Sequence, residues 1–183
     1  QGSRLLFSTM YESHPYHRPV IGYEEVIRNL TRQQITEYYH GRYVPENMFL
    51  MVVGDFECAK MQEKIHQYFD IFPSYPIQRT QRPSEVQDSF ESRVSVQSGS
   101  FQENLIYIAF PIPDAKHEDI PALDVLALIL GQGESPRLNV RLRMKKSLLN
   151  GVSCGTFTPK DPGLFAVSAS LPLKNLGNIL DEI

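Results

Sequence analysis

A polar stretch interrupted by prolines, residues 72–93, most limits how this sequence can fold. Its prolines are Pro73, Pro76 and Pro83. Proline-containing segments without hydrophobic periodicity form extended spacers more readily than helices or strands. We therefore expect two folding units on either side of a linker, with a boundary near residue 80. The predicted units are residues 1–73 and 93–183, and the predicted linker is 74–92.

The composition excludes several classes of protein. The 183 residues are 42% apolar and 21% charged, and the formal net charge is −3. These values are typical of a globular chain with a real core. They lack the excess of basic residues expected of a nucleic-acid-binding protein. The longest apolar run, near Leu123–Leu130, is far shorter than the roughly 20 residues of a membrane span.

Two cysteines, Cys58 and Cys154, do not settle the compartment. The sequence has no C-x-x-C motif and no cluster of cysteine and histidine at metal-binding spacing. Two free thiols are the favoured interpretation, and a single disulfide is the alternative.

The first half of the chain contains two predicted helices around a predicted strand. Thr31-x-x-Gln34 is a capping box, which starts a helix. Met48–Val53 is a continuous apolar run of strand length, which predicts a strand buried on both faces. Glu57–Phe69 has apolar residues on one helical stripe, which predicts an amphipathic helix.

The second half of the chain alternates predicted strands and helices. The predicted strands are 93–97, 104–111, 151–157 and 164–171. Asp119 is the predicted N-cap of a helix to Leu130, which Gly131-Gln132-Gly133 ends, and Ser135-Pro136 starts another that runs to about Lys146. A last helix begins near Asn175, and we expect the natural chain to continue beyond it. The order of elements predicts an α+β fold, with mostly antiparallel sheet packed against helices.

Four motifs, in this order and at this spacing, resemble those of the M16 family of zinc metallopeptidases. The family includes pitrilysin, insulinase and mitochondrial processing peptidase. The motifs are His14-Pro15-Tyr16 with Arg18-Pro19-Val20-Ile21-Gly22; Tyr43-x-Pro45-x-Asn47-Met48 leading to Val52-Val53-Gly54-Asp55; Leu130-Gly131-x-Gly133 with Ser135-x-Arg137-Leu138 and Leu142-Arg143; and Asp161-Pro162-Gly163-Leu164-Phe165. The resemblance implies M16-like half-domains of the LuxS/metalloenzyme type. Residues 1–73 would be the C-terminal part of one M16 domain, and 93–183 the N-terminal part of a second.

The resemblance also shows which chemistry to expect outside this chain. M16 peptidases hold zinc with an H-x-x-E-H helix, in which the glutamate is the general base. The chain has no such motif, because its histidines are His14, His17, His40, His66 and His117, and no two are four apart. The zinc-binding helix is expected upstream of Arg4. We therefore assign zinc to the parent protein and no metal ligand to this chain. His14 and His17, with Glu12 nearby, suit a surface or packing role better than a metal site.

The third motif, which ends at Leu142-Arg143, implies two candidate substrate contacts. Active M16 members carry an arginine and, seven residues later, a tyrosine, which bind the substrate backbone and stabilise the oxyanion. Arg143 matches the arginine, and Asn150 stands at the tyrosine position. An asparagine amide can donate a hydrogen bond but is shorter than a phenol, so Asn150 is the weaker candidate. The simpler alternatives are a solvated basic helix face for Arg143 and a turn position for Asn150.

Two functions follow from the resemblance. The first is a piece of a zinc-dependent metalloendopeptidase that hydrolyses peptides in a clamshell chamber, in which this piece supplies scaffold and substrate contacts but no catalytic residue. The second is a non-catalytic, structural or peptide-binding subunit of a heterodimer. The expected partners are a peptide substrate and the remaining M16 domains or a partner M16 subunit. The bacterial cytoplasm or periplasm is favoured over the mitochondrion.

Overall fold

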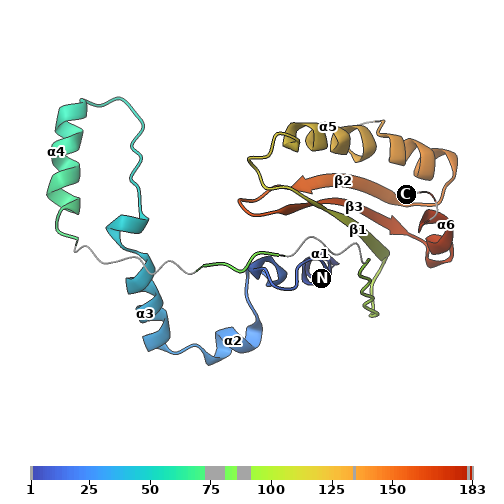
Figure 1. The fold of residues 1–183 in the computed structure, drawn as a ribbon, viewed down its shortest axis with the longest axis horizontal. Coiled ribbons are helices and arrows are strands. Elements are labelled where there is room, and N and C mark those ends of the chain that lie inside the picture. The colour runs from blue at the N-terminus through green and yellow to red at the C-terminus, as the bar shows by residue number, and fades with distance from the viewer. Residues whose placement is uncertain (1, 73–80, 86–91, 134, 181, 183) are drawn as a thin grey trace. The chain divides into compact units, whose positions relative to one another are not determined.

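The computed structural model describes residues 2–72, 81–85, 92–133, 135–180 and 182. These residues form two compact units (Figure 1). One unit combines Gln1–Pro19 with Pro83–Ile183, and the other is Val20–Arg82. The predicted division into 1–73, 74–92 and 93–183 stays a prediction, since most of the predicted linker lies outside the described residues.

A three-stranded antiparallel sheet is the centre of the first unit. Its strands are β1 (Asn104–Ile112), β2 (Gly151–Phe157) and β3 (Gly163–Leu171). The spatial order is β1-β3-β2, so that β3 pairs with both neighbours. Val167 of β3 lies opposite Ile108 on one side and Cys154 on the other. The three strands confirm the predictions for 104–111, 151–157 and 164–171, and the fold is α+β.

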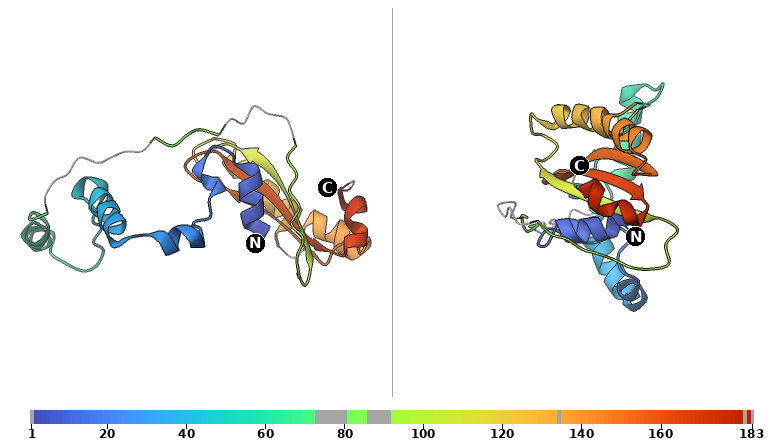
Figure 2. Two further views of the ribbon diagram at one scale, coloured as in Figure 1. Left: turned by 90° about the horizontal axis from the view of Figure 1, so that it is seen from below. Right: turned by 90° about the vertical axis from the view of Figure 1, so that its right-hand side faces the viewer.

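Helices cover both faces of this sheet. Helix α5 (Ile120–Gly131) packs mainly on β2, and α1 (Gly2–Met10) packs on β1. Figure 2 shows these two helices on opposite faces of the sheet. The alternation along β3 explains how both are accommodated, because its odd-numbered residues are buried while most of its even-numbered residues are half-buried.

Two apolar clusters lie on the α5 face. The first joins α5 to the sheet through Ile112, Ile120, Ala127, Cys154, Phe165 and Val167. A side chain at Gly131 would place its Cβ 2.2 Å from the backbone nitrogen of Cys154, so α5 can approach β2 this closely only with glycine there. The second cluster contains Leu142, Leu149, Ala169, Leu171 and Ile179, and it includes residues from α6 (Leu176–Leu180).

The segment after α5 differs from its prediction. The sequence predicts an ordinary helix up to Lys146, but Asn139–Lys145 form a π-helix, labelled η3. π-Helices are rare, occur mostly as short bulges within α-helices, and are frequent at functional sites. The position of the helix is confirmed, whereas its winding could not be read from the periodicity of its apolar residues.

The second unit contains helices and an extended segment. The helices are α2 (Glu24–Asn29), α3 (Arg32–Arg42) and α4 (Cys58–Phe69), with a 3₁₀ turn, η2 (Pro45–Asn47). The predicted capping box of α3 is confirmed, since Thr31 Oγ1 accepts from the Gln34 N–H and the Gln34 side chain accepts from the Thr31 N–H.

Two predicted strands are wrong in the structure. Met48–Val53 has no ladder partner among the described residues, and its side chains are exposed, Phe49 by 87% and Val53 by 86%. Residues 93–97 likewise pair with no strand that the structure describes, and Val94 and Val96 are exposed. Both have the composition of a strand, but a strand also needs a neighbour for its backbone N–H and C=O groups, and the described part of the chain offers none to them.

Among the described residues, no helix is both long enough and apolar enough to cross a membrane.

Candidate functional site

The π-helix η3 displays Arg143 on the surface of the first unit. The side chain of the preceding residue, Leu142, is fully buried in the second apolar cluster and anchors the segment. The Arg143 side chain is exposed, and within the described residues no hydrogen bond or ion pair engages it. Its guanidinium is therefore free to donate to an incoming carbonyl or carboxylate oxygen.

A strained turn ends this helix and leads to Asn150. Ser147 adopts a left-handed conformation with φ of 51°. The N–H of Ser147 donates to the Arg143 carbonyl at 3.1 Å, and the N–H of Leu148 donates to the Leu142 carbonyl at 2.8 Å. These bonds close the end of the helix and reverse the chain toward β2.

Asn150 is fixed through its backbone. Its N–H donates to the carbonyl of Ser170 on β3 at 2.8 Å, immediately before β2 begins. The side chain is exposed and, in the described part of the chain, unbonded. The structure therefore places both predicted contacts, Arg143 and Asn150, at the two ends of one short connection, and neither side chain is used for packing. Their contact with a substrate stays a prediction.

Glu182 forms ion pairs with two basic residues of the η3 segment, Arg141 and Lys146. Its Oε2 lies 2.7 Å from Nη2 of Arg141, an ion pair without an aligned hydrogen bond, and Lys146 donates to its Oε1. The hydrogen bond from Lys146, together with the positive charge of Arg141 and against the cost of burial, lowers the pKa of the Glu182 carboxyl.

The His14-Pro15 motif packs against the Asp161-Pro162 motif, although the two are far apart in sequence. His14 is only 3% exposed. Its Nδ1 accepts from the Tyr16 N–H at 3.3 Å, and its Nε2 lies 3.5 Å from Oδ2 of Asp161 without an aligned hydrogen bond. The Tyr16 hydroxyl donates to the same carboxylate oxygen at 3.2 Å. The two motifs therefore form one structural contact inside the first unit.

A tyrosine strengthens this contact from the end of α1. The Tyr11 hydroxyl donates to the Pro162 carbonyl at 3.1 Å, and its ring packs edge to face on Tyr16. Burial, with the nearby Tyr16 and Glu85, raises the pKa of the Tyr11 phenol well above its usual value. The phenol therefore stays protonated and acts as a donor.

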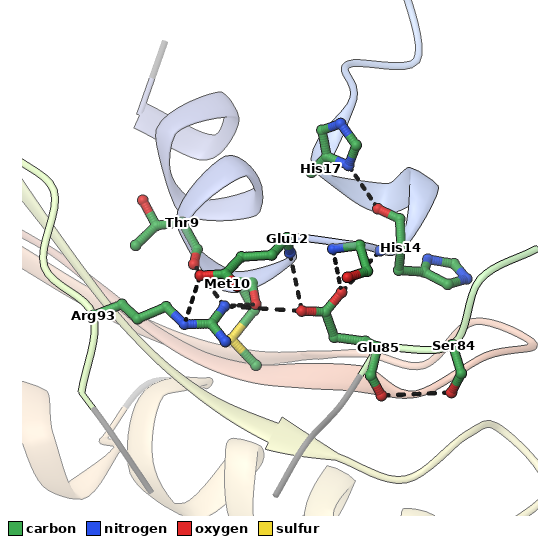
Figure 3. A network of polar contacts seen from close by, with 9 residues as sticks. Thr9, Met10, Glu12, His14, His17, Ser84, Glu85 and Arg93 are labelled. Carbon is green, nitrogen blue, oxygen red and sulfur yellow. Dashed lines mark hydrogen bonds and ion pairs between the residues drawn. The ribbon is translucent and has the colours of Figure 1, made fainter. Parts of the chain in front are cut away.

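Glu85 fastens the start of the second half of the chain to the first segment (Figure 3). Its carboxylate accepts from the backbone N–H groups of Glu12, Ser13 and His14 at 2.9, 2.9 and 2.8 Å. Burial alone would raise the pKa of this carboxyl, but the three N–H donors and the charge of Arg93 outweigh it and lower the pKa. The Glu85 side chain is only 8% exposed, so this contact is part of the packed structure and not a solvent-exposed surface interaction.

Arg93 completes the same network. It donates to the Met10 carbonyl at 3.1 Å and forms an ion pair with Glu12 at 3.4 Å. The guanidinium thus lies at the C-terminal end of α1, where a positive charge is favourable. We name Glu85, Arg93 and the backbone of residues 9–14 the Glu85 clamp.

The residues that the structure describes do not fit a zinc ion. No three of their histidine, cysteine or carboxylate groups converge on a common point. The ring of His17 faces the His14 carbonyl at 2.8 Å, while the His14 ring faces Tyr16 and Asp161. The two histidines that are close in sequence are therefore occupied in packing. No chemical step is assigned to a metal held by this chain.

Sequence reasoning missed Glu85, Arg93 and Glu182. Glu85 contacts residues more than 70 positions away, and Glu182 contacts Lys146 36 positions away. The spacing of residues within a helix or strand cannot predict contacts over such sequence separations. The only signal was a pair of motifs, at residues 14–16 and 161–163, that had no function assigned to them.

The family assignment follows from comparison with known proteins. A family model described as the peptidase M16 inactive domain matches residues 29–183. The chain belongs to the M16 family. The match covers the exposed segment 48–53, the sheet and η3, and so includes Arg143 and Asn150.

Similar proteins are zinc proteases and related subunits. The zinc protease PqqE of Helicobacter pylori is 30% identical over 162 residues, which is 87% of this chain and 36% of that protein. The probable mitochondrial-processing peptidase subunit beta of Schizosaccharomyces pombe is 26% identical, over 97% of this chain and 41% of that protein. A solved protease structure from H. pylori has a TM-score of 0.78 and 27% identity, covering 96% of this chain and 44% of that one. The chain thus spans less than half the length of the relatives it matches.

Proposed function

We propose that this M16 chain is part of a zinc-dependent metalloendopeptidase whose metal site lies in another part of the protein. The support is its 30% identity to a zinc protease over 87% of the chain. In this proposal the chain supplies scaffold and substrate contacts to a chamber that encloses a peptide. The bacterial cytoplasm or periplasm is proposed as its location, since most of the similar proteins cited are bacterial.

Arg143 is the proposed substrate contact in this chain. A free guanidinium on an anchored helix can donate to peptide carbonyl oxygens and to the oxyanion that forms when water attacks. The exposure of Arg143, next to the fully buried Leu142, supports this role. Asn150 is the weaker contact, because its amide reaches less far than the tyrosine hydroxyl of active members.

The test is a peptidase assay on the full-length protein. Activity should be lost with a chelator and restored by zinc. Arg143→Ala should lower kcat/KM by roughly 100-fold, the loss typical of removing one oxyanion donor. Arg137→Ala is the matched control, because Arg137 lies near the start of the same helical segment, is exposed and makes no ion pair within the described residues. If Arg143→Ala shows wild-type kcat/KM, Arg143 is not a substrate contact.

A non-catalytic subunit is the second candidate. The matching family model describes an inactive domain, one relative is named as a subunit, and Asn150 replaces the expected tyrosine. If this candidate is right, the purified full-length protein should be inactive alone. It should then bind peptide, or support hydrolysis, only when a zinc-bearing M16 partner is added.

A further inference from the structure

The winding of η3 brings two cations to one side of the helix. Arg141 lies inside the π-helix, and Lys146 is its C-cap, five positions later. In an α-helix, residues five apart diverge by about 140°. A helix closed by i→i+5 bonds turns less per residue than an α-helix, so it brings residues five apart closer to one side. The π-helical winding therefore explains how both side chains reach the single carboxylate of Glu182.

The position of Glu182 suits it to hold this winding. It follows α6, where Ile179 is fully buried against the same cluster as Leu142. The Glu182 N–H donates to the Ile179 carbonyl at 3.1 Å. Its side chain is 21% exposed, so the ion pairs lie at the edge of an apolar contact. The carboxylate thus ties η3 to α6 beside the core.

Arg143 is oriented by the same rotation of the helix. Arg141 and Arg143 flank the buried Leu142, so they lie on different sides of η3. Arg141 and Lys146 both pair with Glu182, whereas Arg143 has no ion-pair partner in the described part of the chain. Any rotation of η3 that released Arg141 from Glu182 would also redirect Arg143.

We propose that Glu182 is a positioning residue, which holds the π-helical winding of η3 through Arg141 and Lys146 and thereby directs Arg143 toward the substrate. The proposal rests on the proposed function of Arg143. The proposal goes beyond that function, because it assigns a role to Glu182, a residue that follows α6. Glu182 itself touches no substrate.

The test combines hydrogen exchange with kinetics in the full-length protein. Glu182→Gln keeps the size of the side chain and removes its charge. We expect backbone amides of residues 144–148 to exchange about tenfold faster, and kcat/KM to fall several-fold. Glu118→Gln is the matched control, since Glu118 is exposed and makes no ion pair among the described residues. It should change neither quantity.

A double-mutant cycle separates positioning from general destabilisation. If Glu182 acts through Arg143, adding Glu182→Gln to Arg143→Ala should lower kcat/KM no further, while the amides still exchange faster. Additive losses, or unchanged exchange in Glu182→Gln, would overturn the proposal. If Glu182→Gln speeds exchange but Arg143→Ala keeps wild-type kcat/KM, the proposed role of Arg143 is refuted instead. The two failures are thereby distinguished.

Discussion

At the scale of single residues, Ser147 holds a conformation that its side chain disfavours. A left-handed backbone costs an L-residue about 1–2 kcal/mol, and φ at Ser147 is 51°. Glycine avoids this cost but loses more conformational entropy on folding. We expect Ser147→Gly to stabilise the protein by about 0.5–1 kcal/mol in urea unfolding.

Ser100→Gly is the control for this substitution. Ser100 is exposed and does not have positive φ, so glycine there should only add freedom to the unfolded chain. It should be neutral or slightly destabilising. A loss of stability in Ser147→Gly comparable to that control would show that the serine hydroxyl matters more at position 147 than the backbone strain.

The candidate contacts themselves could be named from sequence only through family resemblance. Arg143 is one of several basic residues on its segment, and no periodicity separates it from Arg141. The structure distinguishes them, because Arg141 pairs with Glu182 whereas Arg143 has no partner in the described part of the chain. That difference depends on a residue near the end of the sequence, which no local pattern can reveal.

At the scale of elements, the Glu85 clamp joins two segments that are far apart in sequence. We expect Glu85→Gln to weaken the protection of the amides of Glu12, Ser13 and His14 against hydrogen exchange, because an uncharged amide oxygen is a weaker acceptor than a carboxylate. The free energy of local opening at these amides should fall by about 1–2 kcal/mol. The loss is no larger because water competes for the partly exposed N–H donors. Glu103→Gln, an exposed carboxylate, should leave these amides unchanged.

The clamp should also respond to pH. The pKa of Glu85 is lowered from its usual value of 4.5. A carboxyl with a lowered pKa in the folded state stabilises the fold above the unfolded pKa, and this contribution is lost as pH falls through the folded value. Protection of residues 12–14 should thus be full above about pH 5 and fall in more acidic solution in the wild type. The Glu85→Gln variant should not show this acid-dependent loss of protection. If the variant still shows it, another titrating group is responsible.

Elements with a local signature were predicted well. The capping box located α3, and the turn residues at 159–163 located the pair β2 and β3. Met48–Val53 and residues 93–97 failed for one shared reason: sequence composition indicates that a segment suits a sheet, but not that a neighbouring strand is there to pair with it.

At the scale of the whole molecule, the sequence predicted the fold class and the family, but not the contacts that join residues 1–19 to the second half of the chain. Residues 1–19 join the second half because Tyr11, His14 and Tyr16 pack on the turn at Asp161-Pro162, and because Glu85 and Arg93 bind the end of α1. Each contact is a single side chain that meets a distant backbone or carboxylate. Helical and strand periodicities contain no information about such pairings.

The same scale decides whether these 183 residues can act alone. Hydrolysis by an M16 peptidase requires a bound zinc ion to activate water, and three or more convergent donors are needed to hold it. The described residues contain no such group. We expect the isolated chain to show no chelator-sensitive peptidase activity and no tight zinc site in calorimetric titration. His14→Ala and His17→Ala should leave any residual weak binding unchanged. Submicromolar zinc binding that either substitution abolished would place a metal site in this chain and contradict the division of labour proposed for the parent protein.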